Sequence, residues 1–114
     1  MIFITRIPTH YNDGTPVPPA VWRAITAEVN VLFSGWTLEE AAEGAWTDED
    51  GKVYSERSRR LEVACQRGDY PAARELVLTI GRRLGQKAMY FEVRYFDGVE
   101  IITVPSAKGR KPTR

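Results

Sequence analysis

The chain has 114 residues, of which 43% are hydrophobic and 27% charged, and its formal net charge is +1. This length fits one domain, and the composition is that of an ordinary globular protein, not of a disordered or membrane-embedded one. The longest apolar stretches fall far short of the ~20 residues that a membrane helix needs, so we expect no membrane partner. The apolar N-terminus lacks the basic start and cleavage site of a secretion signal, and we expect a cytoplasmic protein.

The first third of the chain predicts a strand, a loop and a helix. Residues 2–7 carry apolar side chains on both faces, which is typical of an interior strand. Turn-forming residues dominate the following segment, 8–16. A helix is expected over 19–33, because a proline pair suits its first turn and apolar residues form one helical stripe. Gly35 then predicts a left-handed helix end.

The middle of the chain is less regular. Residues 38–43 have helical propensity while their neighbours favour strand, so their conformation stays open at this point. The Asp50-Gly51 pair predicts a hairpin turn between short strands at 44–47 and 52–55, because such turns need positive backbone angles. Alternating apolar and polar residues over 58–65 predict a half-buried strand that includes Cys65, whose thiol we expect to pack in the core.

The second half predicts a helix followed by two strands. The helix should span 69–84 and end at Gly85, and Gly81 inside it suggests close approach to a neighbouring strand. Strands are expected at 88–96 and 99–104, joined by a turn at Asp97-Gly98. The last ten residues have no apolar period.

This order of elements predicts an α+β fold, a ferredoxin-like sandwich. Two right-handed crossovers would place both helices on one face of an antiparallel sheet, with an extended C-terminal β-hairpin. We expect a single domain over 1–104 and a flexible basic tail over 105–114. The other sheet face should carry exposed rings, and burying them against a second copy would make a homodimer through sheet faces or strand edges. The aromatic residues in question are Trp36, Trp46, Tyr54, Tyr90, Tyr95 and Phe96.

Charge is unevenly distributed along the chain. The last ten residues carry four bases and no acid, so the rest of the chain has twelve bases against fifteen acids. A strongly basic domain, which is typical of a nucleic-acid binder, is therefore absent. Nucleic-acid binding stays an alternative because guanidinium groups next to aromatic rings can pair phosphates and stack bases. The residues for this role are Arg57, Arg59, Arg60, Lys108, Arg110 and Lys111.

Residues for catalysis or metal binding are few. One histidine and one cysteine do not form a transition-metal motif, and the acidic run near Asp48 lacks the ligand spacing of a calcium loop. No glycine-rich loop opens a helix, and no serine lies in a nucleophile turn. We therefore expect no metal and no cofactor.

The segment 8–16 is the best candidate for a functional loop, because its polar and aromatic groups could offer hydrogen bonds to a small ligand. The alternative interpretation is an ordinary turn with Tyr11 packed against the core. The residues that we predict to bind a ligand or partner are His10, Tyr11, Asn12, Asp13, Trp46, Tyr54, Arg57 and Arg59.

Two stretches, residues 44–54 and 80–93, resemble a group of small bacterial, phage and mobile-element proteins of ferredoxin-like type. The shared residues are Gly44-Ala45-Trp46, Asp48, Asp50-Gly51, Val53-Tyr54, Ile80-Gly81, Leu84-Gly85-Gln86, Ala88 and Tyr90-Phe91-Glu92-Val93. The resemblance covers most of residues 1–104. It implies a small sheet-and-helix domain of phage or plasmid origin, and it implies no activity and no site residues.

Three functions follow as hypotheses. The first is a noncatalytic interaction module that sequesters a protein partner or a small, anionic, nucleotide-like ligand. The second is a nucleic-acid binder that uses the arginines and the basic tail. The third is a small enzyme with a site between subunits, in which His10 works with Asp13, Tyr54 or Glu56 as acid and base. We favour a noncatalytic role because no catalytic constellation is visible.

Overall fold

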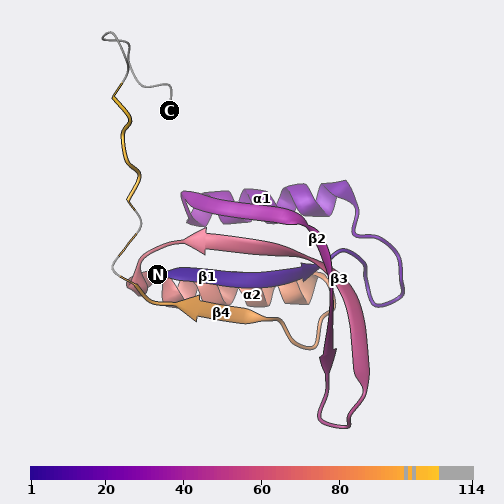
Figure 1. Ribbon diagram of the computed structural model, residues 1–114. Helices are drawn as coiled ribbons and strands as arrows, with labels where there is room; N and C mark the ends of the chain where they lie inside the picture. Colours follow the sequence, from indigo (N-terminus) through magenta and orange to yellow (C-terminus); the bar gives the residue numbers. More distant parts are fainter. Residues whose placement is uncertain (97, 99, 106–114) are drawn as a thin grey trace.

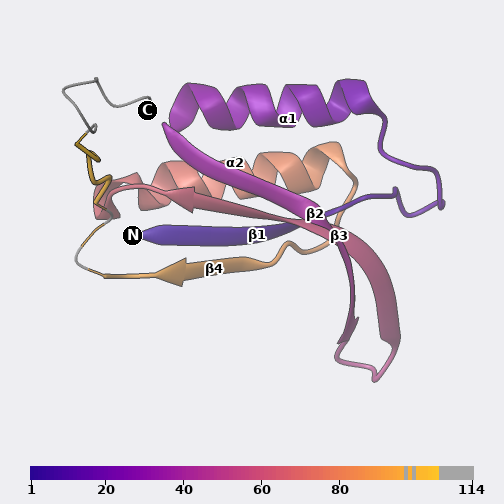
Figure 2. The same cartoon turned by 45° about the horizontal axis from the view of Figure 1, so that its top comes forward.

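The computed structural model describes residues 1–96, 98 and 100–105. Its elements are β1 (Ile2–Pro8), α1 (Pro19–Leu32), β2 (Gly35–Thr47), β3 (Val53–Ala64), a short 3-10 helix (Arg67–Asp69), α2 (Tyr70–Arg83) and β4 (Phe91–Arg94). The strands form one sheet in the order β2-β3-β1-β4, and every neighbouring pair is antiparallel. Both helices cover the same face of this sheet (Figures 1 and 2). The architecture is α+β and is consistent with the predicted ferredoxin-like fold.

The core lies between the sheet and the two helices. Phe3 and Ile7 of β1 are fully buried there, together with Leu61 and Val63 of β3. The predicted stripes of both helices face them: the buried residues are Ile25 and Val29 in α1 and Ala73, Leu76, Val77 and Ile80 in α2. The ring of Phe3 meets Phe33 edge-on at 5.4 Å between centroids. Apolar burial of this kind is the main stabilising term of the domain.

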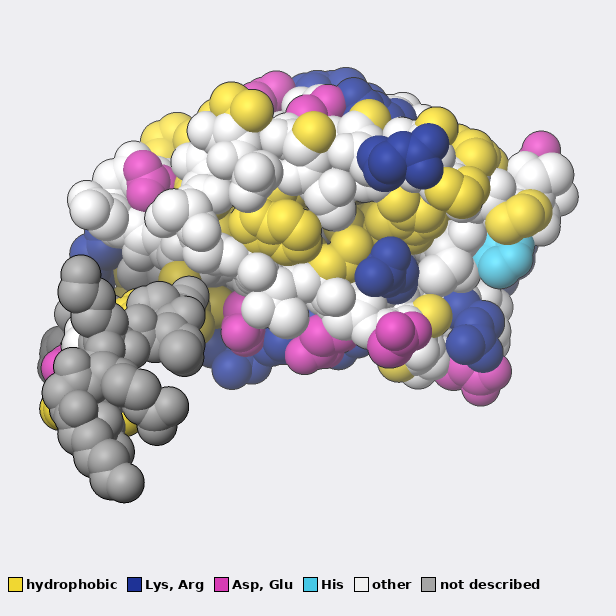
Figure 3. Space-filling model, turned by 90° about the horizontal axis from the view of Figure 1, so that it is seen from above, with side chains coloured by type: hydrophobic (Ala, Val, Ile, Leu, Met, Phe, Trp, Pro, Cys, Tyr) yellow, Lys and Arg dark blue, Asp and Glu magenta, His cyan; other side chains and the backbone are white. Residues whose placement is uncertain are grey.

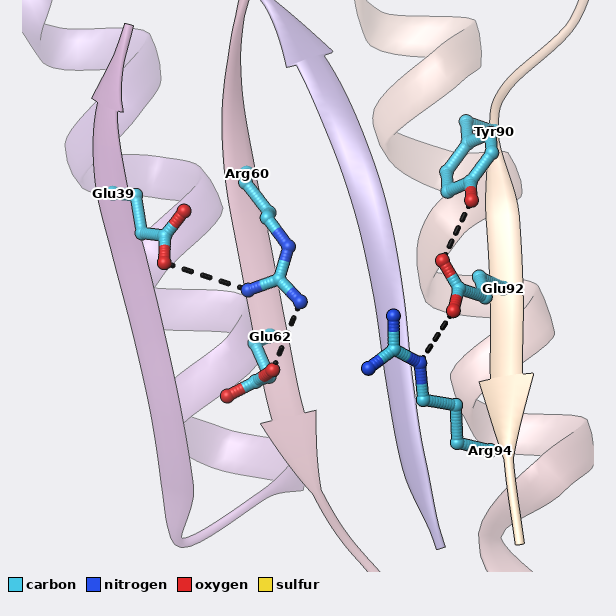
Figure 4. A network of polar contacts seen from close by, with 6 residues as sticks. All are labelled: Glu39, Arg60, Glu62, Tyr90, Glu92 and Arg94. Atoms are coloured by element: carbon cyan, nitrogen blue, oxygen red, sulfur yellow. Dashed lines mark hydrogen bonds and ion pairs between the residues drawn. The ribbon is translucent and has the colours of Figure 1, made fainter. Parts of the chain in front are cut away.

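The open face of the sheet, opposite the helices, is charged. Arg60 lies between Glu39 and Glu62, at 3.4 and 3.0 Å, and Glu92 accepts hydrogen bonds from Tyr90 and Arg94 (Figure 4). The expectation of exposed rings on this face is therefore largely wrong. Trp36 packs toward the helices, and the Trp46 and Tyr54 rings belong to the hairpin of β2 and β3. Of the predicted rings, Tyr90 does lie on this face, 51% exposed and bonded to Glu92, among mainly salt-bridged side chains (Figure 4).

Residues 38–43, for which the sequence alone did not decide between helix and strand, are strand throughout. The helical propensity of residues 38–43 is overridden by pairing with β3, and the predicted hairpin at Asp50-Gly51 extends into two long strands. Gly51 has the positive φ of 82° that this turn requires. The prediction for Gly35 is wrong: α1 ends at Leu32, Phe33 is already extended, and Gly35 opens β2 without a positive φ.

In α2, the predicted helix end at Gly85 and the predicted close contact at Gly81 are both confirmed. Gly85 has a φ of 65°, in the left-handed region that favours glycine. A side-chain carbon added at Gly81 would lie 2.7 Å from the Cγ of Met89, so a bare backbone lets the segment before β4 approach α2. No helix in the described part of the chain is long and apolar enough to cross a membrane.

The predicted C-terminal hairpin is not formed. β4 ends at Arg94, and residues 95, 96, 98 and 100–105 carry no strand; among the residues that the structure describes, β4 pairs only with β1. Asp97 and Val99, which belong to the predicted turn, lie outside the described residues. So do residues 106–114, most of the predicted basic tail, with Lys108, Arg110 and Lys111.

Candidate functional site

A cavity of about 730 Å³ lies beside the C-terminal end of β1. Four segments line it: the end of β1, the loop that follows β1, the hairpin of β2 and β3, and the segment between α2 and β4. β1 runs antiparallel to both β3 and β4, so its end lies next to the region where each of those strands begins. The sheet order therefore brings residues far apart in sequence to one place.

Local hydrogen bonds fix the loop 9–16. The backbone N–H of Thr9 donates to the carbonyl of Arg57 at 3.0 Å, and Tyr11 N–H donates to the carbonyl of Thr15 at 2.8 Å. The Asn12 amide donates to the carbonyl of Gly85 at 3.0 Å and accepts from Gln86 at 3.2 Å. The loop is thus tied to β3 on one side and to the end of α2 on the other.

A β-bulge shapes the opposite wall. Leu38 pairs with Leu61 and Ala41 pairs with Arg59, so β2 holds one more residue than β3 in this interval. Such an extra residue bends a strand and increases its twist. Beyond the bulge, the hairpin of residues 41–59, here called the hairpin arm, curves away from the rest of the sheet (Figures 1 and 2).

Two stacked rings occupy the hairpin arm. Trp46 and Tyr54 face each other across the strands with centroids 4.6 Å apart and an interplanar angle of 14°. The Lys52 ammonium lies 4.9 Å from the Tyr54 centroid, and the Tyr54 hydroxyl donates to Asp48 at 3.2 Å. Trp46 is the more exposed ring, at 46%. A flat aromatic surface therefore lines the cavity.

Asp48 holds the tip of the hairpin arm. Its Oδ1 accepts hydrogen bonds from the backbone N–H groups of Lys52 and Asp50, at 3.0 and 2.9 Å. These bonds lower the pKa of the Asp48 carboxyl below its ordinary value of 3.8, and the bond from Lys52 has the largest effect. The ionised side chain orders the turn below the ring pair.

Charged groups in the cavity are mostly basic. Arg6, Arg57 and Lys87 line it, and Glu56 is the one carboxylate among the lining residues. Partial burial raises the pKa of the Glu56 carboxyl above its ordinary value of 4.5, because its charged form loses water. Arg57 forms an exposed ion pair with Glu43 at 3.4 Å, whereas no ion pair of Arg6 or Lys87 occurs among the described residues.

Tyr90 closes the cavity on the side of β4. Its carbonyl accepts a 2.6 Å hydrogen bond from the buried hydroxyl of Thr5, which anchors the segment 86–90 to β1. Its own hydroxyl donates to Glu92 at 2.6 Å, and this bond raises the pKa of the Tyr90 phenol above 10.0. Tyr90 therefore connects the cavity to the charged open face of the sheet (Figure 4).

Six of the eight residues predicted from sequence to bind a ligand line this one cavity. They are His10, Tyr11, Asn12, Trp46, Tyr54 and Arg57. Asp13 does not line it: this carboxylate accepts two hydrogen bonds from Thr15, at 2.7 and 3.0 Å, which lower its pKa and stabilise the turn. Arg59 lies elsewhere as well, with its guanidinium 4.9 Å from the Trp22 ring.

Arg6, Gln86 and Lys87 line the cavity and were missed by sequence analysis. The sequence did contain one signal for the last two, because they directly follow the helix stop at Gly85, where the chain must turn. Arg6 carries no comparable signal. Its position is evident only from the sheet order.

The arginines of the nucleic-acid alternative do not share one surface. Arg57 forms an ion pair with Glu43, and Arg59 lies over the ring of Trp22 in α1. Arg60 lies on the open face of the sheet between two glutamates. Figure 3, seen from the side of α1 and β2, shows hydrophobic side chains gathered across the middle of the face with charged groups of both signs around them. These arginines therefore do not form a continuous basic surface.

A second hollow, of about 570 Å³, lies between α1 and α2 and is almost wholly apolar. Ala27, Val31 and Leu76 are among the residues that line it. It holds few polar groups that could orient a ligand, unlike the first cavity. Within the described residues, no three side chains of His, Cys, Asp or Glu gather as metal ligands.

No protein-family model and no curated protein sequence matches the chain. Its structure is similar to that of a phage SAM lyase solved in complex with S-methyl-5'-thioadenosine, with a TM-score of 0.62 and 13% sequence identity. The similarity covers 79% of this chain and 76% of the lyase chain. At this identity the comparison shows that the two proteins share a fold, and the protein with the shared fold is encoded by a phage.

Proposed function

We propose that the chain binds a small nucleoside-type ligand in the cavity beside the end of β1. The observation that carries the proposal is the Trp46–Tyr54 stack at the wall of a cavity that also presents basic side chains. Aromatic faces stack bases and attract cationic centres, and stacking contributes about 1–3 kcal/mol per base. A ligand that carries an adenine ring and an anionic group would suit both features, because the ring can stack and the anion can pair with the basic side chains.

The shared fold supports the choice of the first ligands to test. The structure neighbour is a phage SAM lyase in complex with S-methyl-5'-thioadenosine. SAM, or S-adenosylmethionine, combines an adenine ring, a positively charged sulfonium and a carboxylate. The aromatic rings of the cavity can stack on the adenine and attract the sulfonium. The basic side chains of Arg6 and Lys87 can pair with the carboxylate. A noncatalytic role would then be sequestration of this ligand.

Isothermal titration with SAM, S-methyl-5'-thioadenosine and ATP tests the binding. Trp46→Ala should weaken the binding of SAM and of S-methyl-5'-thioadenosine about tenfold or more, because it removes the exposed stacking face. Tyr95→Ala is the matched control: this ring is as exposed as Trp46 but lies outside the cavity, and its removal should leave affinity unchanged. Absence of binding by the wild-type chain would refute the proposal.

The basic side chains predict selectivity between these ligands. Arg6→Ala should weaken SAM about tenfold and leave S-methyl-5'-thioadenosine unchanged, because only SAM carries a carboxylate. Equal weakening of both ligands would show that Arg6 supports the cavity and does not read the carboxylate.

A second candidate function, cleavage of SAM, is favoured by Glu56. This carboxylate lines the cavity and has a raised pKa, which brings proton exchange closer to neutral pH. In this reaction the Glu56 carboxylate would take a proton from the β-carbon of the methionine part, and a double bond would form between the β- and γ-carbons. The bond between sulfur and the γ-carbon then breaks, sulfur keeps that electron pair, and the products are S-methyl-5'-thioadenosine and the unsaturated amino acid 2-aminobut-3-enoate. Chromatography of SAM incubated with the protein distinguishes the two functions. Binding without product supports sequestration, whereas product formation that Glu56→Gln abolishes without loss of binding supports catalysis.

A further inference from the structure

The chain beyond β4 exposes a short apolar segment. Ile101, Ile102 and Val104 are 70%, 71% and 70% exposed. Figure 1 shows this segment leading away from the sheet, on the side where β4 ends. β-Branched residues at this density favour a strand, and their exposure leaves apolar surface in water.

β4 offers an edge on which such a strand could pair. It is the last strand of the sheet and pairs only with β1 within the described residues. Its outer edge therefore presents backbone N–H and C=O groups without a ladder partner, which is the arrangement that accepts an added strand. On its helix-facing side, Phe91 and Val93 are only partly buried, and the Tyr70 ring next to Phe91 is 38% exposed.

The sequence specifies a register for this pairing. A two-residue turn at Asp97-Gly98 would place Ile102 opposite Val93 and Val104 opposite Phe91. Cross-strand neighbours share one face of a sheet, so both pairs would be apolar and would extend the core on the helix side. Thr103 would then lie opposite Glu92 on the open face, where a polar side chain is suitable.

We propose that residues 100–104 pair with β4 of a second copy of this chain. Within the described residues, the segment 100–105 forms no strand and β4 pairs only with β1, so the pairing that the sequence specifies can be made between two copies, each giving its segment to the other. Exchange of an identical element in this way closes a symmetric dimer without any new interface chemistry. A second copy fits the outer edge of β4 because its own residues 100–104 can pair there in the register described above.

Sedimentation equilibrium over a range of concentrations tests the dimer. The wild-type chain should sediment at twice the 12.9 kDa of one chain. Ile102→Lys should raise the dimer dissociation constant roughly 10- to 100-fold, because it places a charge opposite Val93 in an apolar contact. Val31→Lys is the control: this residue of α1 is exposed and apolar, and its change should leave the constant unaltered.

Two outcomes would overturn the proposal. One is a wild-type monomer at about 100 µM, a concentration at which a specific dimer should form by mass action. The other is a dimer that Val31→Lys disrupts and Ile102→Lys does not, which would place the contact on the helices.

A second measurement separates pairing between chains from pairing within one chain. In a sample that mixes isotope-labelled and unlabelled chains, filtered nuclear Overhauser spectra should connect Ile102 of one copy with Val93 of the other. Contacts found only within a single chain would show that the hairpin closes on itself, and the exchange would be refuted.

Discussion

The missing side chain at Gly81 decides how closely the segment before β4 can approach α2. Replacement by alanine would bring a methyl group to 2.7 Å from Met89, a distance that real contacts do not tolerate. Alanine favours a helix by about 1 kcal/mol over glycine, while overpacking costs about 1–3 kcal/mol. Gly81→Ala should therefore lower the free energy of unfolding by about 1 kcal/mol, measured by urea denaturation.

Gly44→Ala provides the comparison for this change. No atom lies within 4 Å of the added carbon at that position, so its effect on unfolding should stay within about 0.5 kcal/mol. Equal stability of Gly81→Ala and the wild-type chain would show that Met89 moves aside without cost. Met89 also lines the cavity, so Gly81→Ala should weaken ligand binding as well.

Asp48 predicts a pH dependence at the tip of the hairpin arm. Hydrogen bonds lower its pKa in the folded protein below 3.8, so the folded state favours the ionised carboxylate. Its contribution to stability is present above the unfolded pKa and is lost as the pH falls through the folded value. The Trp46–Tyr54 stack should loosen as the pH falls below about 3.8.

Tryptophan fluorescence in the wild-type chain and in Asp48→Asn would measure this change. The asparagine variant should lack the transition, because its side chain does not titrate. Asp13 and Glu92 also have lowered pKa values and stay in both proteins, so they cannot explain a difference between them. An identical acid transition in both proteins would assign it to another group.

At the scale of elements, periodic patterns predicted both helices, β1 and most of β3. These elements follow from a single apolar stripe or from alternation, which local sequence contains. β2 could not be predicted in the same way: residues 38–43 favour a helix locally, and only pairing with partners in β3 at least fourteen residues away makes them a strand. The prediction of the C-terminal hairpin is wrong for the opposite reason: a strong local turn pattern is present, but residues 100–105, where the structure describes them, do not pair with β4.

We expect the curvature of the hairpin arm, and with it the shape of the cavity, to depend on the bulge in β2. Deletion of Glu40 should remove the extra residue and straighten the hairpin arm, because the two strands would then pair residue for residue. The fold should persist, since the core residues of β3 are unaffected, while nucleoside binding should fall at least about tenfold as the rings move away from Tyr11.

Circular dichroism and titration calorimetry would follow fold and binding separately in this variant. Glu40→Ala keeps the residue count and should behave like the wild-type chain. Unchanged binding after the deletion would mean that the curvature of the hairpin arm does not shape the cavity.

At the scale of the whole molecule, strand order determines which residues meet. β1 ends beside the start of β3 and the start of β4, so the loop after β1, the hairpin arm and the segment before β4 surround one cavity. Composition and motifs identified the loop and the ring-bearing hairpin separately. They could not identify Arg6, because that position becomes a neighbour of the rings only through the sheet. For Lys87 the helix stop at Gly85 indicated a turn, but not that the turn lies beside the rings.

The most direct test of the central claim is nuclear magnetic resonance of the labelled protein during titration with S-methyl-5'-thioadenosine. The account predicts that amide shifts change in the loop 9–16, around Trp46 and Tyr54, and in residues 86–90, and hardly change in α1. Shifts confined to the groove between the helices or to the charged open face, or no shifts at all, would contradict it.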